Sequence, residues 1–230
     1  MVSESKFYII FGLSFNLMKK NIASIRSDYK RGLIHFDTLD CSPIAQFKKW
    51  FDNALNANVK EVNAFVLSTI SSDLVPSGRV VLLKAVDESG FVFFTNYESA
   101  KARSLESNPI ASMTFFWPKL EQQIRIVGKV DKINSKDSDE YFNSRPRESQ
   151  ISAIASNQSC KILNRDVILN KVSELKKKYL DKNIPRPENW GGYILNPYKI
   201  EFWQGRPSRL HDRFLYELSD GVWNISRLAP

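Results

Sequence analysis

Short apolar segments joined by tight turns occupy most of the chain between residues 64 and 228, and this pattern limits the fold more than any other feature. Each segment has the length of a β-strand, and turn residues such as those at 87–90 separate neighbouring segments. Helical spacing appears between some of them, without the regular strand–helix alternation of a parallel sheet. We therefore expect a mainly β, α+β fold in which an antiparallel barrel or sandwich carries peripheral helices.

The expected elements follow from changes in hydrophobic period along the chain. Strands are expected over residues 64–70, 79–85, 91–95, 111–117, 122–132, 192–195, 199–203, 212–217 and 222–228. Helices are expected over residues 21–31, 99–107, 135–144 and 164–180, and a further helix begins at Pro43 with Ser42 as its N-cap. No internal repeat or long linker divides the chain, so we expect one domain over residues 35–230 after an N-terminal segment of residues 1–34.

Two helices carry apolar stripes that are expected to face the core. The stripe residues are Ile44, Phe47, Phe51, Ala54 and Leu55 in the first helix, and Ile168, Val172, Leu175 and Tyr179 in the second.

The composition excludes several common classes of site. Two cysteines and two histidines are too few for a disulfide framework or a zinc site of standard spacing. The nine glycines never occur as G-x-G, and H-E-x-x-H is absent. We therefore expect no metal, no NAD in a Rossmann site and no ATP in a P-loop.

The chain is basic, with 33 Lys and Arg against 25 Asp and Glu, a net charge of +8. Half of the excess lies in the first 34 residues, and no other helix or stripe concentrates it. A small anionic ligand such as a phosphate ester is therefore favoured, and nucleic acid is the alternative partner.

An apolar run over residues 7–17 is shorter than the roughly 20 residues that a membrane-spanning helix needs. It also lacks the flanking pattern of a signal peptide. We expect a cytoplasmic protein with no membrane partner, and we keep open the hypothesis that Met18 is the natural start.

Polar residues that interrupt apolar strands mark candidate sites, because burying an unpaired charge is costly. Arg79 and Lys84 stand at the two ends of one apolar run, where a single strand would direct them to opposite faces. One interpretation is that the two side chains bind ligands, and the other is that they reach water at the strand ends. Their spacing alone does not distinguish the two interpretations.

Two further segments have the character of phosphate sites. Thr95, Asn96, Ser99 and Lys101 stand where a strand leads into a helix, which suits either phosphate binding or plain helix capping. Residues 141–150, YFNSRPRESQ, end a helix with two arginines around a proline, which suits phosphate or simply a helix C-terminus that favours cations.

The segment over residues 201–213, EFWQGRPSRLHDR, is the strongest candidate. If it is extended, Arg209, His211 and Arg213 share one face and need an anion between them. Trp203 offers a flat surface for an aromatic ring. A histidine between two arginines is expected to be held neutral, ready for hydrogen bonding or proton transfer, although a lone histidine is often structural.

No serine or cysteine triad can be assembled around His211, so a bound cofactor that carries the reaction explains these residues better. In these segments the sequence resembles the pyridoxine (pyridoxamine) 5′-phosphate oxidase family. The resemblance covers roughly residues 25–230 and rests on IRSDYKRG, RVVLLK, QQIRIVG, YFNSRPRESQI, SNQS, WGGY, EFWQGRPSRLHDR and RLAP.

The resemblance implies an FMN-binding split β-barrel that works as a homodimer with FMN at the subunit interface. It implies oxidation of pyridoxine or pyridoxamine 5′-phosphate to pyridoxal 5′-phosphate, with hydride transfer from substrate C4′ to flavin N5 and reduction of O2 to H2O2. Residues 1–34 would then include a basic lid that closes over the site.

The resemblance also implies residue roles. The implied FMN contacts are Arg79, Val80, Val81, Leu82, Phe94, Thr95, Lys101, Gln123, Gln158, Ser159, Trp203 and Arg213. The implied substrate contacts are Arg26, Tyr29, Lys84, Tyr141, Arg145, Ser149, Arg209, Leu210 and His211, with Arg209 and His211 as the catalytic pair.

One position departs from the pattern, since Ala100 stands where the family usually has arginine before Lys101. The loss of a charged donor predicts FMN binding weaker by about one to two decades, unless Arg103 reaches in. Ser152, where glycine is common, is a smaller departure.

Three rival interpretations remain open. In the first, the chain is a related phenazine-pathway oxidase with a larger substrate. In the second, it holds pyridoxal 5′-phosphate or FMN without turnover. In the third, it binds nucleic acid.

Overall fold

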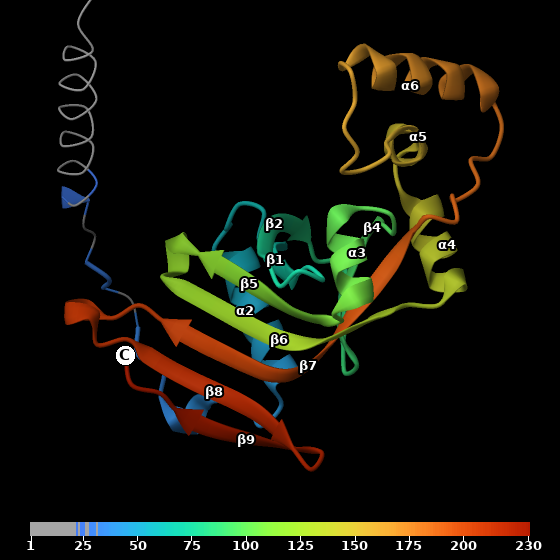
Figure 1. Ribbon diagram of the computed structural model, residues 1–230. Helices are drawn as coiled ribbons and strands as arrows, with labels where there is room; N and C mark the ends of the chain where they lie inside the picture. The colour runs from blue at the N-terminus through green and yellow to red at the C-terminus, as the bar shows by residue number, and fades with distance from the viewer. Residues whose placement is uncertain (1–21, 23, 26–27, 31) are drawn as a thin grey trace, which may run out of the picture.

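The computed structural model describes residues 22, 24–25, 28–30 and 32–230 (Figure 1). The expected helix over residues 21–31 lies mostly outside them, and so does Arg26. No helix of the described residues has the length and apolar content to cross a bilayer. Within the same residues no group of three or more His, Cys, Asp or Glu is placed to hold a metal ion.

A nine-stranded antiparallel sheet forms the centre of the molecule. The strands are β1 Ala64–Ile70, β2 Pro76–Leu82, β3 Ala85–Asp87, β4 Gly90–Asn96, β5 Ile110–Trp117, β6 Gln122–Lys132, β7 Trp190–Gln204, β8 Asp212–Ser219 and β9 Val222–Arg227. Their order is β2-β1-β5-β6-β7-β4-β3, and the β8–β9 hairpin pairs with the second half of β7. The expected antiparallel, mainly β fold is confirmed.

The two ends of this strand order meet at one short connection, so that the sheet curls into a split barrel. β2 and β3 stand at opposite ends of the order, yet only Leu83 and Lys84 separate them in the chain. The backbone N–H of Leu83 donates to Asn63 O beside β1, and that of Lys84 donates to Val92 O of β4. The connection thereby places the Lys84 side chain at the junction of two sheet edges.

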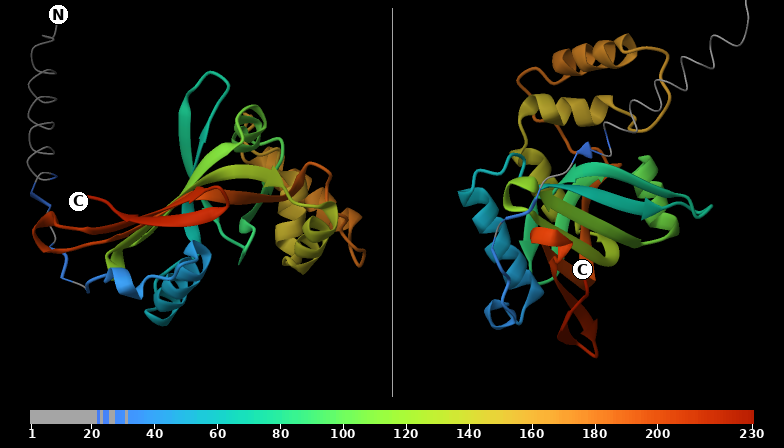
Figure 2. Two further views of the ribbon diagram at one scale, coloured as in Figure 1. Left: turned by 90° about the horizontal axis from the view of Figure 1, so that it is seen from below. Right: turned by 90° about the vertical axis from the view of Figure 1, so that its left-hand side faces the viewer.

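Eight helical elements with described bounds accompany the sheet. Five are α-helices, namely α2 Pro43–Asn56, α3 Ala100–Ser107, α4 Ser135–Ser144, α5 Arg147–Ala155 and α6 Asp166–Lys178. Three are short 3₁₀ turns, namely η1 Phe36–Thr38, η2 Pro118–Leu120 and η3 Pro207–Arg209. Figure 2 shows α4, α5 and α6 gathered at one end of the sheet, away from the C-terminus.

Aromatic side chains fill the main core between α2 and the curled sheet. Ser42 Oγ caps α2 by accepting from Ala45 N, as predicted. Phe47 of this helix meets Phe91 and Phe115 at ring-centroid distances of 4.9 and 5.2 Å. Ile44, Phe47 and Ala54 are buried as expected, but Leu55 is 49% exposed because it lies off the helix face that Phe47 and Ala54 share.

A second, smaller core joins α4, α5 and α6 to the start of β7. Phe142, Ile151, Ile184 and Trp190 are buried there. Val172 and Leu175 of α6 and its C-cap Tyr179 pack against this cluster, as the predicted stripe requires, whereas Ile168 is not part of the cluster.

Three sequence-based boundaries are wrong for identifiable reasons. β2 starts at Pro76 and ends at Leu82, because an edge strand tolerates a proline and the chain turns at Leu83. The two strands expected over residues 192–195 and 199–203 are one strand, β7, since a bulge opposite Gly128 accommodates Pro197. Helix α5 was not expected at all.

Candidate functional site

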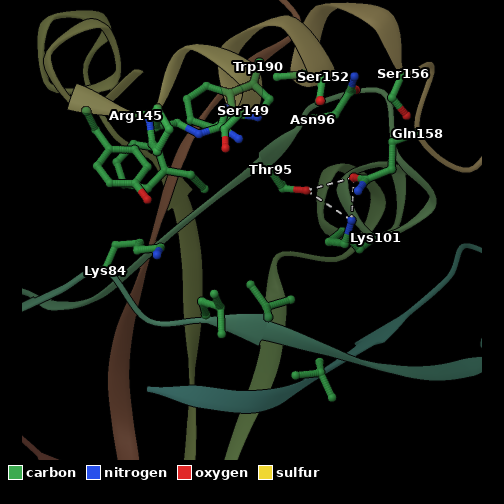
Figure 3. A pocket seen from close by; sticks show the side chains of 17 residues that line it. Lys84, Thr95, Asn96, Lys101, Arg145, Ser149, Ser152, Ser156, Gln158 and Trp190 are labelled. Carbon is green, nitrogen blue, oxygen red and sulfur yellow. Dashed lines mark hydrogen bonds between the residues drawn. The ribbon is translucent and has the colours of Figure 1, made fainter. Parts of the chain in front are cut away.

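A groove of about 570 Å³ opens between strands β2 and β4 on one side and helices α4 and α5 on the other (Figure 3). Twelve of the residues singled out in the sequence line it, namely Val80, Val81, Leu82, Lys84, Phe94, Thr95, Asn96, Lys101, Tyr141, Arg145, Ser149 and Gln158. The groove therefore joins three segments that are far apart in the sequence.

One end of the groove is built around the ammonium group of Lys101. Its Nζ donates to Thr95 Oγ1 at 3.0 Å, to Ser99 Oγ at 3.1 Å and to Gln158 Oε1 at 2.8 Å. Burial, and then the nearby charge of Arg79, lower the pKa of Lys101 to about 8. Because Ser99 makes no capping hydrogen bond to the helix, capping alone does not explain these residues.

The other end carries Arg145, Lys84 and Ser149 (Figure 3), and Tyr141 lies beside Lys84. The Arg145 guanidinium lies 4.7 Å from the Trp190 ring centroid, and Lys84 Nζ lies 5.9 Å from that of Tyr141. Phe94, stacked on Tyr141 at 3.9 Å and on Trp190 at 5.5 Å, completes a rigid aromatic wall. Arg147 turns away and donates to the carbonyls of Tyr179 and Lys182, so only one arginine of this segment faces the groove.

The cations of the groove have no carboxylate partner in the part of the chain that the structure describes. Among the described residues no ion pair joins Lys84, Lys101 or Arg145 to a carboxylate. Arg145 Nη1 and Asn96 Nδ2 are buried donors with no acceptor. Burial lowers the pKa of Arg145 from its usual value. Donors left unsatisfied beside uncompensated cations fit anionic oxygen atoms such as those of phosphate esters.

Arg79 and Ser159 border the groove without lining it. Arg79 Nη1 donates to Leu67 O and to Thr69 Oγ1, and its side chain lines the adjacent cavity next to Ala100. Ser159, which has a φ of 72°, accepts from the backbone N–H of Ala100 at 3.2 Å. The expectation that a single strand directs Arg79 and Lys84 to opposite faces is wrong, because β2 ends at Leu82 and Lys84 follows it.

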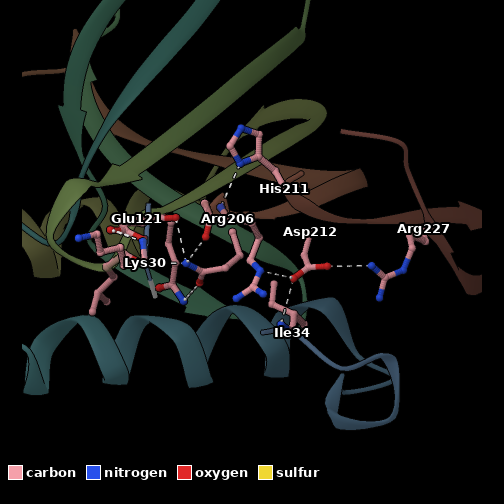
Figure 4. Close-up of polar contacts among 11 residues, drawn as sticks. Lys30, Ile34, Glu121, Arg206, His211, Asp212 and Arg227 are labelled. Carbon is pink, nitrogen blue, oxygen red and sulfur yellow. Dashed lines mark hydrogen bonds and ion pairs between the residues drawn. The ribbon is translucent and has the colours of Figure 1, made fainter. Parts of the chain in front are cut away.

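A separate pocket of about 580 Å³ contains Tyr29, Trp203, Arg209 and His211. The His211 ring lies 4.7 Å from Trp203 and 5.7 Å from Tyr29, centroid to centroid. His211 Nδ1 accepts from the backbone N–H of Arg206 at 3.1 Å (Figure 4). Burial, and then the charges of Arg209 and Arg213, lower the pKa of His211, as the sequence predicts.

The expected common face of Arg209, His211 and Arg213 does not form. Pro207–Arg209 is a tight turn in which Ser208 and Arg209 have φ values of 56° and 61°, and β8 begins only at Asp212. Arg213 Nε instead donates to Glu201 Oε1 at 2.9 Å, and Arg125 pairs with the same carboxylate. Burial opposes ionisation of Glu201, but these two arginines lower its pKa overall. The anion that this segment requires is therefore supplied partly by Glu201.

The groove and the aromatic pocket share no residue within one chain. Gln123 lies beside the aromatic pocket, because it is the register partner of Trp203 where β6 pairs with β7. Leu210 is 69% exposed and lines neither cavity. Ile25, Asp28 and Tyr29 of the N-terminal segment line the aromatic pocket. Two backbone contacts hold this segment nearby, since Lys30 N donates to Glu121 and Ile34 N donates to Asp212 (Figure 4).

Several groove residues were missed by sequence reasoning. They are Pro146, Ser152, Ala153, Ser156 and Trp190. Four of these belong to α5 or its flanks, and the Pro146–Glu148 start was a usable helix signal, since proline and an acid favour the first turn. Ser152 was noted only as a departure from glycine.

Comparison with known protein families gives two matches. Residues 51–179 match the family described as "Pyridoxamine 5'-phosphate oxidase". Residues 190–230 match the family described as "Pyridoxine 5'-phosphate oxidase C-terminal dimerisation region". The groove is made by the first match together with Trp190, and the aromatic pocket by the second match together with the N-terminal segment.

Individual relatives agree with these matches. A pyridoxine/pyridoxamine 5'-phosphate oxidase of Christiangramia forsetii is 49% identical over 93% of this chain and 100% of its own length. The crystal structure of PhzG from Burkholderia lata 383, in complex with tetrahydrophenazine-1-carboxylic acid, has a TM-score of 0.83 and 30% identity over 89% of this chain and 100% of that chain. A pyridoxamine 5'-phosphate oxidase-related, FMN binding protein from Nostoc punctiforme PCC 73102 has a TM-score of 0.65 and 16% identity over 84% and 100% of the two chains, which supports the fold.

Proposed function

Because the chain belongs to the pyridoxamine 5′-phosphate oxidase family, we propose that it is an FMN-dependent oxidase that makes pyridoxal 5′-phosphate from pyridoxine or pyridoxamine 5′-phosphate. The 49% identity to a curated enzyme of this name over nearly the whole chain supports the substrate class.

The observation that carries the proposal is the pair of anion-binding ends on one groove. Lys101, with Thr95 and Gln158, would hold the phosphate end of FMN. Arg145, with Lys84 and Ser149, would hold the phosphate of the substrate. The unpartnered Arg145 Nη1 and Asn96 Nδ2 fit this use, because each lacks only an acceptor.

Bound FMN would supply the two-electron acceptor, taking a hydride from substrate C4′ and returning the electrons to O2. The balance for the alcohol is one R-CH2OH and one O2 giving one R-CHO and one H2O2. For the amine, one water is consumed and one ammonia is released in addition.

His211 and Arg209 would act on the substrate ring. Because His211 Nδ1 accepts from Arg206 N, the neutral imidazole carries its proton at Nε2. His211 would therefore donate a hydrogen bond from Nε2, and Arg209 would place a positive charge beside it. Tyr29, packed against both His211 and Trp203, would help to exclude water.

The proposed active unit is a homodimer. The residues of the aromatic pocket and those of the groove are separate in one chain, while the resemblance gives both to a single site. In the dimer, Trp203, Arg209 and His211 of one protomer would complete the groove of its partner. The match of residues 190–230 to a dimerisation region supports this arrangement.

Aerobic turnover of pyridoxine 5′-phosphate with added FMN tests the proposal. Pyridoxal 5′-phosphate and H2O2 should appear in equal amounts. If FMN binds but neither product forms with either B6 phosphate, the substrate assignment is wrong.

A second candidate is oxidation of a reduced phenazine, favoured by the TM-score of 0.83 to PhzG. The two candidates differ in the need for a substrate phosphate. Loss of activity on Arg145→Met would follow for the B6 phosphates, whereas a phenazine carboxylate without phosphate should be turned over by the parent chain if the second candidate is right.

A further inference from the structure

A cavity of about 400 Å³ lies beside the groove and is lined by serines and two arginines. Its hydroxyl groups come from the β1–β2 turn, from the start of β2 and from α3, namely Ser71, Ser72, Ser77, Ser104 and Ser107. Arg79 and Arg103 supply its two positive charges, and no acidic residue lines it. A wall of hydroxyls and guanidinium groups matches the oxygen atoms of a phosphate group.

Both guanidinium groups of this serine pocket are bonded to neutral acceptors. Arg79 donates to Leu67 O at 3.0 Å and to Thr69 Oγ1 at 2.8 Å, while Arg103 donates to Glu98 O. The Glu98 carboxylate is engaged elsewhere, since it accepts from Asn189 Nδ2 at 2.8 Å. No ion pair of either arginine occurs among residues 32–230 and the few described before them. The positive charge of the pocket is therefore uncompensated.

The serine pocket lies next to the Lys101 end of the groove, although the two cavities share no lining residue. Arg79 and Ala100 line the pocket, and the next residues in the chain, Val80 and Lys101, line the groove. Ala100 offers no side-chain donor at this boundary, and its backbone N–H is already bonded to Ser159 Oγ. Arg103 stands three residues later in α3 and so presents its side chain on the same helix face as Ala100.

We infer that Arg103 is a binding residue for the phosphate group of the cofactor and forms, with Arg79, a two-guanidinium clamp at the place where Ala100 provides no donor. The inference rests on the proposed function, since it takes FMN as the ligand. It assigns Arg103 a role that the family resemblance does not give it and that the sequence raises only as an exception to the expected loss at Ala100. It also changes the expected effect of Ala100, because the missing donor is replaced from the next turn of the helix.

Comparison of FMN with riboflavin, which lacks the phosphate, tests the inference by quenching of flavin fluorescence. Arg103→Ala should weaken FMN binding about 10- to 100-fold, the range for a lost charged hydrogen bond. Riboflavin binding should change by less than about twofold, because no phosphate is present to contact the arginine. Arg103→Lys, which keeps the charge but loses the fork of donors, should fall between the two.

A second variant pair makes the test specific. Ala100→Arg in the Arg103→Ala background should restore most of the FMN affinity, since it returns a guanidinium to the same helix face. Lys60→Ala, which removes an exposed cation from the turn before β1, serves as the charge control and should leave FMN affinity unchanged. Circular dichroism of each variant checks that α3 is intact.

The outcomes separate the inference from the proposed function. FMN binding by the parent chain with an unchanged affinity in Arg103→Ala would overturn the inference and leave the function standing. Equal losses for FMN and riboflavin would also overturn it, since the effect would then be structural. If the parent chain bound no FMN, both would fall together.

Discussion

The anion contact proposed for Lys101 requires a protonated ammonium group, and the lowered pKa of Lys101 makes this requirement measurable. With a pKa of about 8 before a ligand binds, the ammonium group loses its proton as the pH rises through 8. The dissociation constant for FMN should therefore rise above pH 8, by up to about tenfold per pH unit. Titrations between pH 7 and 9.5 should show this rise for FMN but not for riboflavin, and Lys101→Met should bind FMN weakly with little pH dependence. A flat profile for the parent chain would contradict the assignment.

Arg145 illustrates a residue that serves binding at no gain to stability. Its Nη1 is buried without an acceptor, although the guanidinium packs on Trp190. Arg145→Met removes the unsatisfied donor and keeps much of the apolar contact, so thermal unfolding should shift by less than about 2 °C. The KM for pyridoxine 5′-phosphate should rise roughly 10- to 100-fold, since a charged contact to phosphate is lost. A large fall in melting temperature would instead mark Arg145 as a structural residue.

At this scale the sequence predicts which residues carry charge but not which way they point. Lys101 and Arg145 were found because cations beside strands and prolines need an explanation. Arg147 shares the motif of Arg145 yet turns to the carbonyls of Tyr179 and Lys182, which depends on the packing of α6 and the loop after it. Asn96 was noted for its position alone, and only the folded chain reveals its unpartnered amide.

Helix α4 is held in place by Arg186, whose side chain is only 11% exposed. Its guanidinium donates to Asp139 Oδ1, to Ser135 Oγ and to Trp190 O, each at 2.6 Å. These contacts tie the helix that carries Tyr141 to the strand that carries Trp190. Arg186 is therefore expected to act as a positioning residue for the phosphate end of the groove.

Arg186→Met should raise the KM for the phosphorylated substrate roughly tenfold with a smaller change in kcat, because the hydrogen bonds that align α4 with β7 are lost. A tenfold effect corresponds to about one charged hydrogen bond. Arg186→Lys should recover part of the effect, since an ammonium group can still reach one of the acceptors. Arg165→Ala, an exposed arginine before α6, is the matched control. If kcat and the free energy of unfolding both fell, the effect of the substitution would reflect general unfolding and not positioning.

The bulge between β6 and β7 depends on Gly128. A Cβ at this position would lie 2.3 Å from Asn196 O and 2.8 Å from Asn196 C, both backbone atoms that cannot move freely. Gly128→Ala should therefore destabilise the fold by about 1–3 kcal/mol, measured by urea unfolding. Gly221→Ala would be a poor control because its φ is 77°, whereas Gly32→Ala has open space around its Cβ and should be nearly neutral.

Elements with a clear period were predicted closely, and those shaped by their partners were not. The strands over 64–70 and 122–132 and the helix over 135–144 have the predicted bounds. β7 was divided in two because Pro197 lacks an N–H, and only its pairing with the bulge at Gly128 explains its tolerance. Helix α5 carries a weak apolar stripe, so its own sequence does not distinguish it from a loop.

For the whole molecule, the proposed dimer predicts complementation between variants. One variant, Lys84→Met, should have a damaged groove and an intact aromatic pocket. The other variant, His211→Asn, should have an intact groove and a damaged aromatic pocket. When the two inactive variants are co-expressed, each mixed dimer has one intact composite site. Random mixing should then restore about a quarter of the parent activity. No recovery in mixed dimers isolated with two affinity tags would contradict a site shared between protomers.

The division between the two cavities could not be read from the sequence. The resemblance assigns Lys84, Arg145, Trp203 and His211 to one site, and nothing in their spacing says how many chains contribute. The structure shows the first two in the groove and the last two in the separate aromatic pocket. Quaternary arrangement enters at this point, because it depends on surfaces that periodicity and motif spacing do not describe.

The unpaired cations of the groove also bear on how long the protein persists in a cell. Lys84, Lys101 and Arg145 repel one another in the folded chain and separate when it unfolds, so their mutual repulsion favours unfolding. An anionic ligand that binds only the folded form reverses this balance, by about 2.7 kcal/mol when its free concentration is 100 times its dissociation constant. The abundance of the protein should consequently follow the supply of flavin nucleotide, with proteases removing the chains that find none.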